Sequence, residues 1–261
     1  MSPAFDRDRQ AVLETARAAE VSPLIITGND IESSAAAYTF AREHAGECYT
    51  TAGVHPHNAK NWNAKTKAEL RDFFSRAGDP LRKPAGIIAA VGECGLDYNR
   101  NFSPQDAQRK CFEDQLALAA ELGKPVFLHE RDAFGDFFAL LKQYRPELPG
   151  AVVHCFTGSA AELEAFLAID CYIGITGWIC DERRGSHLIP LLRQIPADRL
   201  LLETDAPYLL PRNLPRTGGK SSRNEPRFLV HIAAFTAGIL GKPFDQLAVE
   251  TSANAARLFN I

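Results

Sequence analysis

Five apolar runs in this sequence each lead directly into side chains that can bind a metal ion or transfer a proton. These side chains are those of His55 and His57, Glu93, His129, His154, and Asp205. An ionisable group that follows an apolar run is costly to bury unless it faces water, another polar group or a metal ion. Imidazole and carboxylate groups together suit Zn²⁺, Mn²⁺ or Mg²⁺. The joint pattern therefore predicts a metal site, although each residue alone could be a hydrogen-bonded structural side chain or a helix N-cap.

The apolar runs alternate with longer amphipathic stretches, a pattern that is typical of βαβ units and a parallel sheet. Most of the runs are too continuously apolar for a sheet with one face in water, so we expect both faces to be buried. The clearest helical pattern covers Gln105–Leu122, and Gly123 predicts its end. The predicted strands are Leu24–Thr27, Cys48–Val54, Ile87–Glu93, Val126–His129, Ala151–Phe156, Tyr172–Thr176 and Leu200–Thr204.

This alternation predicts an α/β fold of the TIM-type (β/α)₈ barrel, which places catalytic groups at the carboxyl ends of its strands. Barrels of this kind fill about 250 residues as one domain, so we expect residues 1–261 to form a single hydrolase domain. The chain opens on a helical stretch, Asp6–Ala19, with no strand before it. We therefore expect the first strand to be missing from this chain. Either that strand lies upstream of Met1 or the barrel closes in another way.

The charge balance excludes a protein that coats nucleic acid over its whole surface. The chain has 29 basic and 32 acidic residues, a formal net charge of −3. Contact with nucleic acid would therefore need a local basic patch, which two charged loops could supply. The alternative is that these loops are simply solvated. The candidate cations are Arg183 and Arg184 in one loop, and Arg212, Arg216, Lys220, Arg223 and Arg227 in another. Trp178, Tyr208 and Phe156 offer faces for base stacking, with core packing as the alternative.

The cysteines and the apolar runs indicate a cytoplasmic protein that is not bound to a membrane. The six cysteines are scattered and form no C-x-x-C pair, so neither a disulfide framework nor a zinc ribbon is expected. No run reaches the 18 apolar residues of a membrane span, and the N-terminus lacks the apolar core of a signal peptide. Cys94 and Cys155 adjoin predicted ligands but point the other way along a strand, so we interpret them as small apolar packing residues.

Four further motifs occur in order along the chain: Gly92–Asp97, Leu128–His129, Val153–Gly158 and Leu202–Leu209. They closely resemble motifs of the TatD family of metal-dependent deoxyribonucleases, which belongs to the amidohydrolase-like barrels. Two further segments, Gly174–Arg184 and Arg223–Pro226, resemble the bacterial branch of that family. The resemblance covers essentially the whole chain.

The resemblance implies roles for most of the ionisable residues. Glu93 would be the carboxylate that metal ions share, and His129 and His154 would be metal ligands. Asp205 would be a ligand that also orients or deprotonates the attacking water. These residue types agree with phosphodiester hydrolysis, which needs a nucleophile near neutral pH and countercharge on the phosphate oxygens.

Further residues are candidates for contact with the substrate. His57 would hold the scissile phosphate or protonate the leaving oxygen, unless the Pro56 segment merely shapes a turn. The catalytic residues expected are thus Asp205, His57 and Glu93. Substrate-binding candidates are His55, Arg183, Arg212 and Arg223.

The chain departs from many members of the family in one respect. Those relatives carry a His-x-His pair at the end of the first strand, and this sequence has neither the pair nor the strand, as in the bacterial branch. We therefore expect one firmly held ion on Glu93, His129 and His154, and a second ion that is weaker or transient. Mg²⁺ is the expected ion, with Mn²⁺ or Zn²⁺ as alternatives.

The resemblance predicts a metal-dependent nuclease, a 3′→5′ exonuclease on single-stranded DNA with RNA as a second substrate, and a role in DNA repair or degradation. We expect it to act as a monomer. One alternative is another hydrolase on the same barrel, a deacylase of aminoacyl-tRNA or an amidohydrolase, because the same chemistry serves carbonyl centres. A second alternative is a binding protein without catalytic activity.

Overall fold

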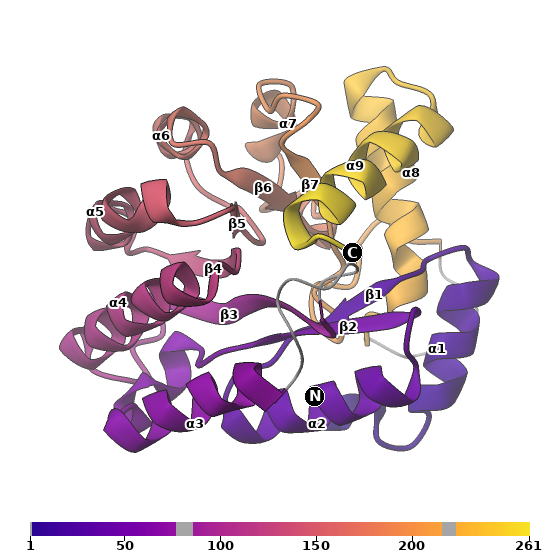
Figure 1. Cartoon of the computed structure of the whole chain (residues 1–261). Helices are drawn as coiled ribbons and strands as arrows, with labels where there is room; N and C mark the ends of the chain where they lie inside the picture. The colour runs from indigo at the N-terminus through magenta and orange to yellow at the C-terminus, as the bar shows by residue number, and fades with distance from the viewer. Residues whose placement is uncertain (1, 77–85, 216–222) are drawn as a thin grey trace.

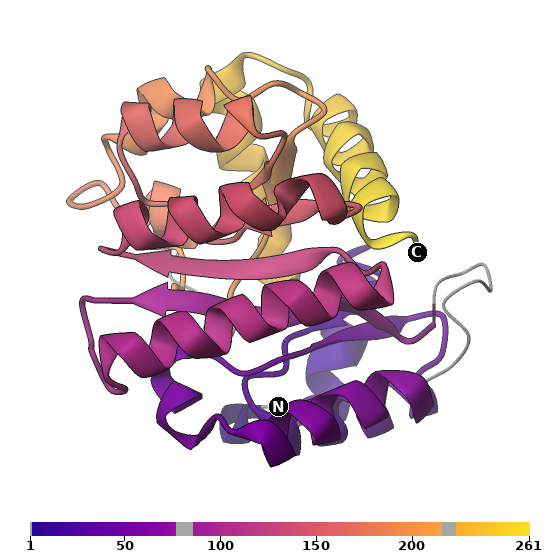
Figure 2. The ribbon, with the colours of Figure 1, turned by 60° about the vertical axis from the view of Figure 1, so that its left-hand side comes forward.

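The computed structural model describes residues 2–76, 86–215 and 223–261, and in these residues the centre is a sheet of seven parallel strands. Each strand pairs with the next one along the chain (Figure 1). Helices lie on the outer side of the curled sheet, as α4 and α5 do beside β3 and β4 in Figure 2. The strands are β1 Leu24–Ile26, β2 Cys48–Ala52, β3 Ile88–Asp97, β4 Val126–Arg131, β5 Ala151–Val153, β6 Tyr172–Ile175 and β7 Leu200–Leu202.

Capping side chains and glycines set the ends of several helices. Asp30 accepts a hydrogen bond from Ser33 N–H at 2.8 Å and begins α2. The predicted helix Gln105–Leu122 is confirmed as α4, and it ends at Gly123, whose φ of +60° suits glycine. The α-helices are α1 Arg9–Ala18, α2 Ile31–Glu43, α3 Ala64–Arg76, α4 Gln105–Leu122, α5 Phe134–Tyr144, α6 Ala160–Ala168, α7 Leu188–Leu192, α8 Leu229–Leu240 and α9 Phe244–Phe259. Short 3₁₀ helices are η1 Pro3–Phe5, η2 Pro56–Asn61, η3 Arg145–Glu147, η4 Gly177–Cys180 and η5 Pro226–Phe228.

This architecture confirms the predicted TIM-type α/β barrel, with seven strands in the described residues in place of eight. Within those residues β1 and β7 form no ladder with each other, so the curled sheet has two edges. Strand β1 is half-buried along its length, whereas the sequence predicts burial of both faces. The difference follows from its place at an edge, where a single neighbouring strand covers it.

Strand β3 is longer than the sequence indicates. The apolar run predicts an end at Glu93, but β3 continues to Asp97 because Gly95–Asp97 pair with His129–Arg131 of β4. All ten residues of β3 are buried. Since side chains alternate along a strand, Cys94 and Leu96 pack in the hydrophobic core while Glu93 and Asp97 face away from it.

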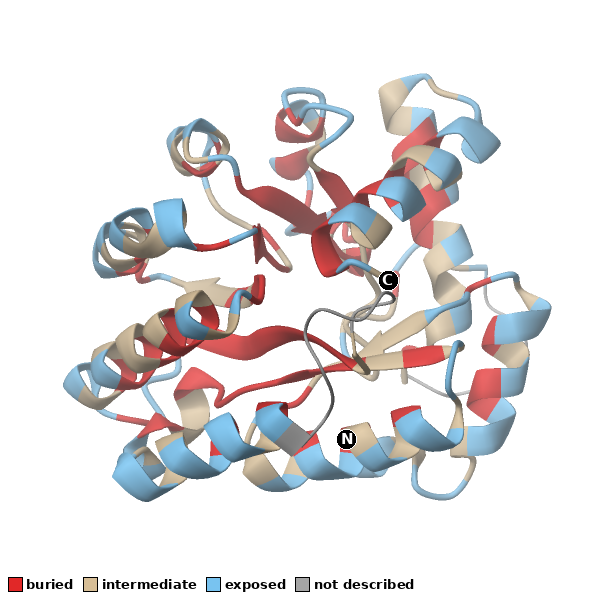
Figure 3. Cartoon of the chain, in the orientation of Figure 1, coloured by how far each residue is buried: buried red, intermediate tan, exposed pale blue. Residues whose placement is uncertain are grey.

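The hydrophobic core includes residues of the sheet and of the helices around it, and Figure 3 shows buried residues on the strands and on parts of the helices. Phe112 of α4 is fully buried and stacks on Phe137 of α5, with ring centroids 5.0 Å apart. At the opposite end of the barrel, Leu258 and Phe259 of α9 pack over the starts of the strands. Each such side chain stabilises the fold by about 1.5–3 kcal/mol. In the described ranges no helix combines the length and apolar character needed to cross a bilayer.

A polar cluster attaches the segment after β2 to helix α4. The carboxylate of Asp114 accepts hydrogen bonds from Trp62 Nε1 at 2.9 Å, Lys67 Nζ at 2.7 Å and Lys110 Nζ at 2.7 Å. Burial alone would raise the pKa of Asp114, but the bonds from Lys110, Lys67 and Trp62 outweigh it and lower the pKa to about 2. The ionised carboxylate therefore stabilises the fold.

We predict that Asp114→Asn lowers the free energy of unfolding by about 2 kcal/mol near neutral pH. Because the folded-state pKa of Asp114 lies below the unfolded one, its contribution is present above about pH 4 and is lost as the pH falls toward 2. Urea unfolding of the parent and the variant at several pH values measures this difference. Glu113→Gln, on the adjacent helix position, is the control, and an equal gap at pH 2.5 and pH 7 would contradict the prediction.

Candidate active site

Ionisable side chains from neighbouring strands meet at the carboxyl end of the sheet. Glu93 comes from β3 and His129 from β4, whereas His154 directly follows β5. His55 and His57 follow β2, and His57 belongs to η2. Because parallel strands place their carboxyl ends at one edge, residues up to 99 positions apart in the sequence lie in one cluster.

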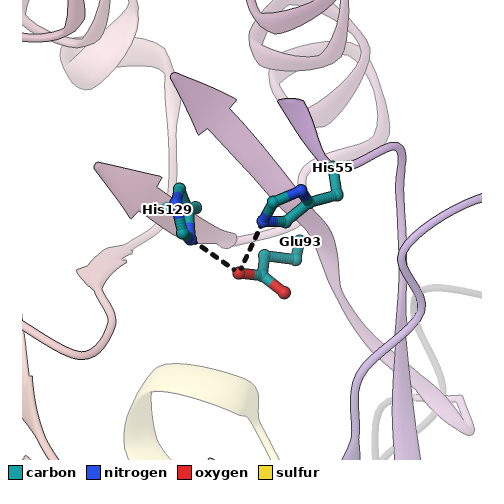
Figure 4. Close-up of side chains that lie close together, drawn as sticks. All are labelled: His55, Glu93 and His129. Atoms are coloured by element: carbon teal, nitrogen blue, oxygen red, sulfur yellow. Dashed lines mark hydrogen bonds and ion pairs between the residues drawn. The ribbon is translucent and has the colours of Figure 1, made fainter. Parts of the chain in front are cut away.

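One carboxylate oxygen, Oε1 of Glu93, is the centre of this cluster. It lies 2.7 Å from His154 Nε2, 3.0 Å from His129 Nδ1 and 3.5 Å from His55 Nε2. In Figure 4 the rings of His55 and His129 approach the carboxylate from two sides. The side chain of Glu93 is 9% exposed, so three imidazoles meet one largely desolvated carboxylate.

The electrostatics of the cluster favour the ionised form of Glu93. Burial alone would raise the pKa of this carboxyl, but the charges of His154 and His55 and the hydrogen bonds from the imidazoles hold it well below its usual value. For His154, burial opposes the charged ring, and the charges of Glu93 and Glu203 outweigh it and raise the pKa well above its usual value. Burial lowers the pKa of His55.

Asp97 is a second carboxylate of the site that the sequence reasoning missed. Its Oδ2 lies 2.6 Å from His57 Nε2 and 3.6 Å from His129 Nε2. Burial opposes its ionisation, but the nearby imidazole of His129 and the hydrogen bond with His57 keep the pKa of Asp97 below its usual value. The signal was available, because Asp97 lies four positions after Glu93 and so on the same face of a strand.

Glu203 holds His154 from the other side. Its Oε2 lies 3.4 Å from His154 Nδ1, and its Oε1 accepts a hydrogen bond from the backbone N–H of Cys155 at 2.9 Å. Gly174 allows this approach, since a Cβ at that position would overlap the Glu203 carboxylate. The sequence reasoning noted Glu203 after β7 but assigned it no role, because nothing in a one-dimensional pattern links it to His154.

Asp205 lies in the loop after β7 with its backbone held firmly. Its backbone carbonyl accepts a hydrogen bond from Tyr208 N–H at 2.9 Å. The buried side chain of Asn224 donates hydrogen bonds to the carbonyls of Thr204 and Tyr208, both at 2.7 Å. Burial raises the pKa of Asp205 to about 7, and the charge of Glu93 acts in the same direction. Asp205 is therefore close to the same group of charges.

The donor atoms present fit a divalent metal ion. One nitrogen or oxygen each from His55, Glu93 and His129 lie within 4.8 Å of one another. His129 Nε2 and His154 Nδ1 are buried and form no hydrogen bond among the described residues, and each faces a carboxylate oxygen, of Asp97 at 3.6 Å and of Glu203 at 3.4 Å. Two or three imidazoles with a carboxylate form a ligand set of the kind that Mn²⁺, Zn²⁺ and related ions accept.

The structure does not bring the predicted arginines into this cluster. The guanidinium groups of Arg183 and Arg212 both contact Asp181, with closest nitrogen-to-oxygen distances of 3.3 Å and 3.4 Å. Arg223 forms a two-pronged ion pair with Asp8, at 2.7 Å and 2.8 Å. These contacts hold loops at the rim, and binding of substrate by the three arginines stays a prediction. Arg216 and Lys220 lie outside the described residues.

The aromatic candidates differ in exposure. Phe156 is buried in the core, as the packing alternative predicts. Trp178 lies under two guanidinium groups, with Arg184 Cζ 4.4 Å and Arg131 Cζ 5.4 Å from its ring centroid. Tyr208 is 64% exposed. Of the cysteines beside the ligands, Cys94 packs in the core as predicted, while Cys155 is half-buried with its Sγ 3.4 Å from Thr176 Oγ1.

Comparison with known proteins assigns this chain to a family. Residues 1–260 match the family described as TatD related DNase. The chain belongs to this family. The predicted resemblance to the TatD family is thereby confirmed, and so is the predicted enzyme class, a hydrolase that acts on ester bonds of nucleic acids.

Curated relatives and solved structures of the TatD family match the whole chain. The 3′-5′ ssDNA/RNA exonuclease TatD of Erwinia amylovora is 52% identical over 260 residues, with 100% of this chain and 96% of that protein covered. The protein of the same name from Cronobacter sakazakii is 52% identical over 259 residues, with 99% and 94% covered. The crystal structure of YJJV, a TatD homologue from Escherichia coli, aligns with a TM-score of 0.86 at 28% identity, covering 100% and 95%. A TatD family hydrolase from Entamoeba histolytica shares the fold, with a TM-score of 0.84 at 24% identity and coverage of 98% and 90%.

We predict that Glu203→Gln weakens binding of Mn²⁺ by about 10- to 100-fold, because outer carboxylates orient the histidines that bind metals. The amide keeps the size of the side chain and can still accept the bond from Cys155, so the change removes mainly the charge beside His154. Isothermal titration calorimetry of the metal-free protein measures the affinity. Glu182→Gln, an exposed carboxyl at the rim, is the control. Equal affinities for the parent and Glu203→Gln would show that Glu203 does not act through His154.

Proposed function

We propose that this protein is a metal-dependent 3′→5′ exonuclease that acts on single-stranded DNA and also on RNA. The observation that carries the proposal is the convergence of His55, His129 and His154 on one oxygen of Glu93, in a chain of the TatD family. The relatives at 52% identity are named as exonucleases of this type, which supports the choice of substrate and polarity.

Glu93, His129 and His154 would hold the ion, with Asp205 as a further ligand. His55 adds a third imidazole beside Glu93. We therefore propose that His55 contributes to the metal site, whereas the sequence predicted that it contacts the substrate. We infer Mg²⁺ as the working ion because a carboxylate-containing set completed by water suits it, with Mn²⁺ or Zn²⁺ as alternatives. A bound divalent ion would supply Lewis acidity toward the phosphate and lower the pKa of a water molecule.

The residues of this chain would perform the remaining steps. Asp205 orients the attacking water and accepts its proton. His57 uses Nε2 for its 2.6 Å contact with Asp97, and its Nδ1 forms no hydrogen bond within the described part of the chain. In the protonated ring, Nδ1–H donates to the leaving oxygen or to the scissile phosphate. Asp97 therefore sets the orientation of the ring that the substrate meets.

We also infer a cellular setting from the chain itself. All six cysteines are free thiols, and several are fully buried, which supports a reducing compartment such as the cytoplasm. The continuous sheet supports one domain, and we propose a monomer that degrades or repairs DNA.

The proposed function predicts hydrolysis that depends on both metal and Glu93. The test is initial-rate measurement on single-stranded DNA labelled at its 3′ or 5′ end, with Mg²⁺, Mn²⁺ or EDTA present. We expect release of the 3′ label first, no hydrolysis in EDTA, and a loss of at least about 10²-fold in kcat for Glu93→Gln.

Two outcomes would overturn this proposal. Glu182→Gln should keep the parent rate, so a variant of Glu93 as fast as that control would remove the cluster from the reaction. Deacylation of aminoacyl-tRNA without hydrolysis of either labelled DNA would show that the same site acts on a carbonyl centre.

A further inference from the structure

Phe102 is a large apolar side chain that the fold leaves in water beside the active site. It lies in the turn that follows β3, and it is 58% exposed. A single exposed apolar side chain is common on protein surfaces, so it is the place of Phe102 beside the site that makes it a candidate for contact with a ligand.

The backbone on both sides of Phe102 is firmly held. Buried Ser103 donates a hydrogen bond from Oγ to the carbonyl of His57 at 2.8 Å and accepts one from Lys60 N–H at 3.0 Å. The Ser103 carbonyl accepts a bond from Gln108 Nε2 at 2.8 Å. On the other side, Arg100 N–H donates to Asp97 Oδ1 at 2.8 Å. The exposed ring is therefore presented by a rigid turn.

The ring of Phe102 borders the catalytic cluster. Its centroid lies 4.7 Å from that of His57, and the two planes meet at 76°. The His57 ring lies in turn 4.3 Å from His55, whose Nε2 is 3.5 Å from Glu93 Oε1. Whichever ring supplies the edge, a T-shaped contact covers at most one face of the phenylalanine ring, so His57 leaves the other face uncovered.

Two positively charged residues belong to the segments that border Phe102. Arg100, two positions before it, is exposed, and so is Lys60, whose backbone is bonded to Ser103. Neither side chain forms an ion pair in residues 2–76, 86–215 or 223–261. Arg183 and Arg212 on other rim loops differ in this respect, because both contact Asp181.

We propose that Phe102 stacks on the base of the nucleotide whose phosphodiester is cleaved, while Arg100 and Lys60 contact the neighbouring phosphates. The inference deepens the proposed nuclease function and rests on it. Every base has a π-face, so such a platform accepts any sequence. Stacking on Phe102 requires a base that is neither paired nor stacked on its neighbours. The Phe102 turn would therefore favour single strands over duplex ends.

The first test measures stacking without catalysis. A single-stranded oligonucleotide with 2-aminopurine as its 3′-terminal base is titrated in EDTA with the parent, Phe102→Ala, Phe102→Tyr and, as the control, Phe244→Ala. Phe244 is another partly exposed phenylalanine, at the start of α9. We expect the parent, Phe102→Tyr and Phe244→Ala to quench the fluorescence on binding, and Phe102→Ala to bind with little quenching. Equal quenching by Phe102→Ala, or no binding by the parent, would overturn the inference.

The second test uses the reaction with metal present. Phe102→Ala should raise KM for single-stranded DNA by about 5- to 100-fold, the cost of one lost base–aromatic stack, with little change in kcat. On an oligonucleotide whose 3′-terminal nucleotide is abasic, the parent and Phe102→Ala should have equal KM values, which a merely structural role would not produce. A KM difference that persists on the abasic substrate would refute stacking. Failure of the parent to hydrolyse any DNA would instead refute the proposed function, while the fluorescence result still decides the stacking contact.

Discussion

The structure depends on one buried carboxylate, Glu93, and on the need to compensate its charge. An isolated ion in this position would cost several kcal/mol, so imidazoles must approach it and the strands that carry them must end together. Strand β3 bends to allow this, because its register with β4 shifts between Val91 and Cys94. Gly92 and Gly95 both have a φ near +140°, and a Cβ at either position would overlap a carbonyl of β4. The glycines of this strand are thus requirements of the site.

Polar contacts connect the N-terminal segment of the chain to the segment that follows β7, at the two edges of the sheet. Arg223 reaches from the segment after β7 to Asp8 and to the carbonyl of Ala4, and its guanidinium lies 4.8 Å from the Phe5 ring centroid. The next residue, Asn224, is fully buried and holds the loop that contains Asp205. Contacts that attach the N-terminal helices to the sheet therefore also stabilise the catalytic loop.

The two sides of the rim of the site differ in how far their positive charges are balanced by nearby carboxylates. On one side, Arg183, Arg184 and Arg212 gather around the buried carboxylate of Asp181, so part of their positive charge is balanced within the protein. On the other side, the turn after β3 presents Arg100 and Phe102 to solvent. A chain with a net charge of −3 can bind a polyanion through such a local surface, because screening limits repulsion from distant acids to about 10 Å.

The sequence by itself determined the barrel, the order of its strands, the helix Gln105–Leu122 and the residues around which the site forms. These follow from local rules: apolar runs make buried strands, Gly123 ends a helix, and parallel strands bring Glu93, His129 and His154 to one edge. Tertiary structure alone decided that β3 extends to Asp97 and that Glu203 holds His154. It also decided that Arg223, a predicted substrate-binding residue, forms an ion pair with Asp8, 215 positions away. The physical reason is that a side chain's partner depends on distances and directions between elements, and spacing along the chain does not contain them.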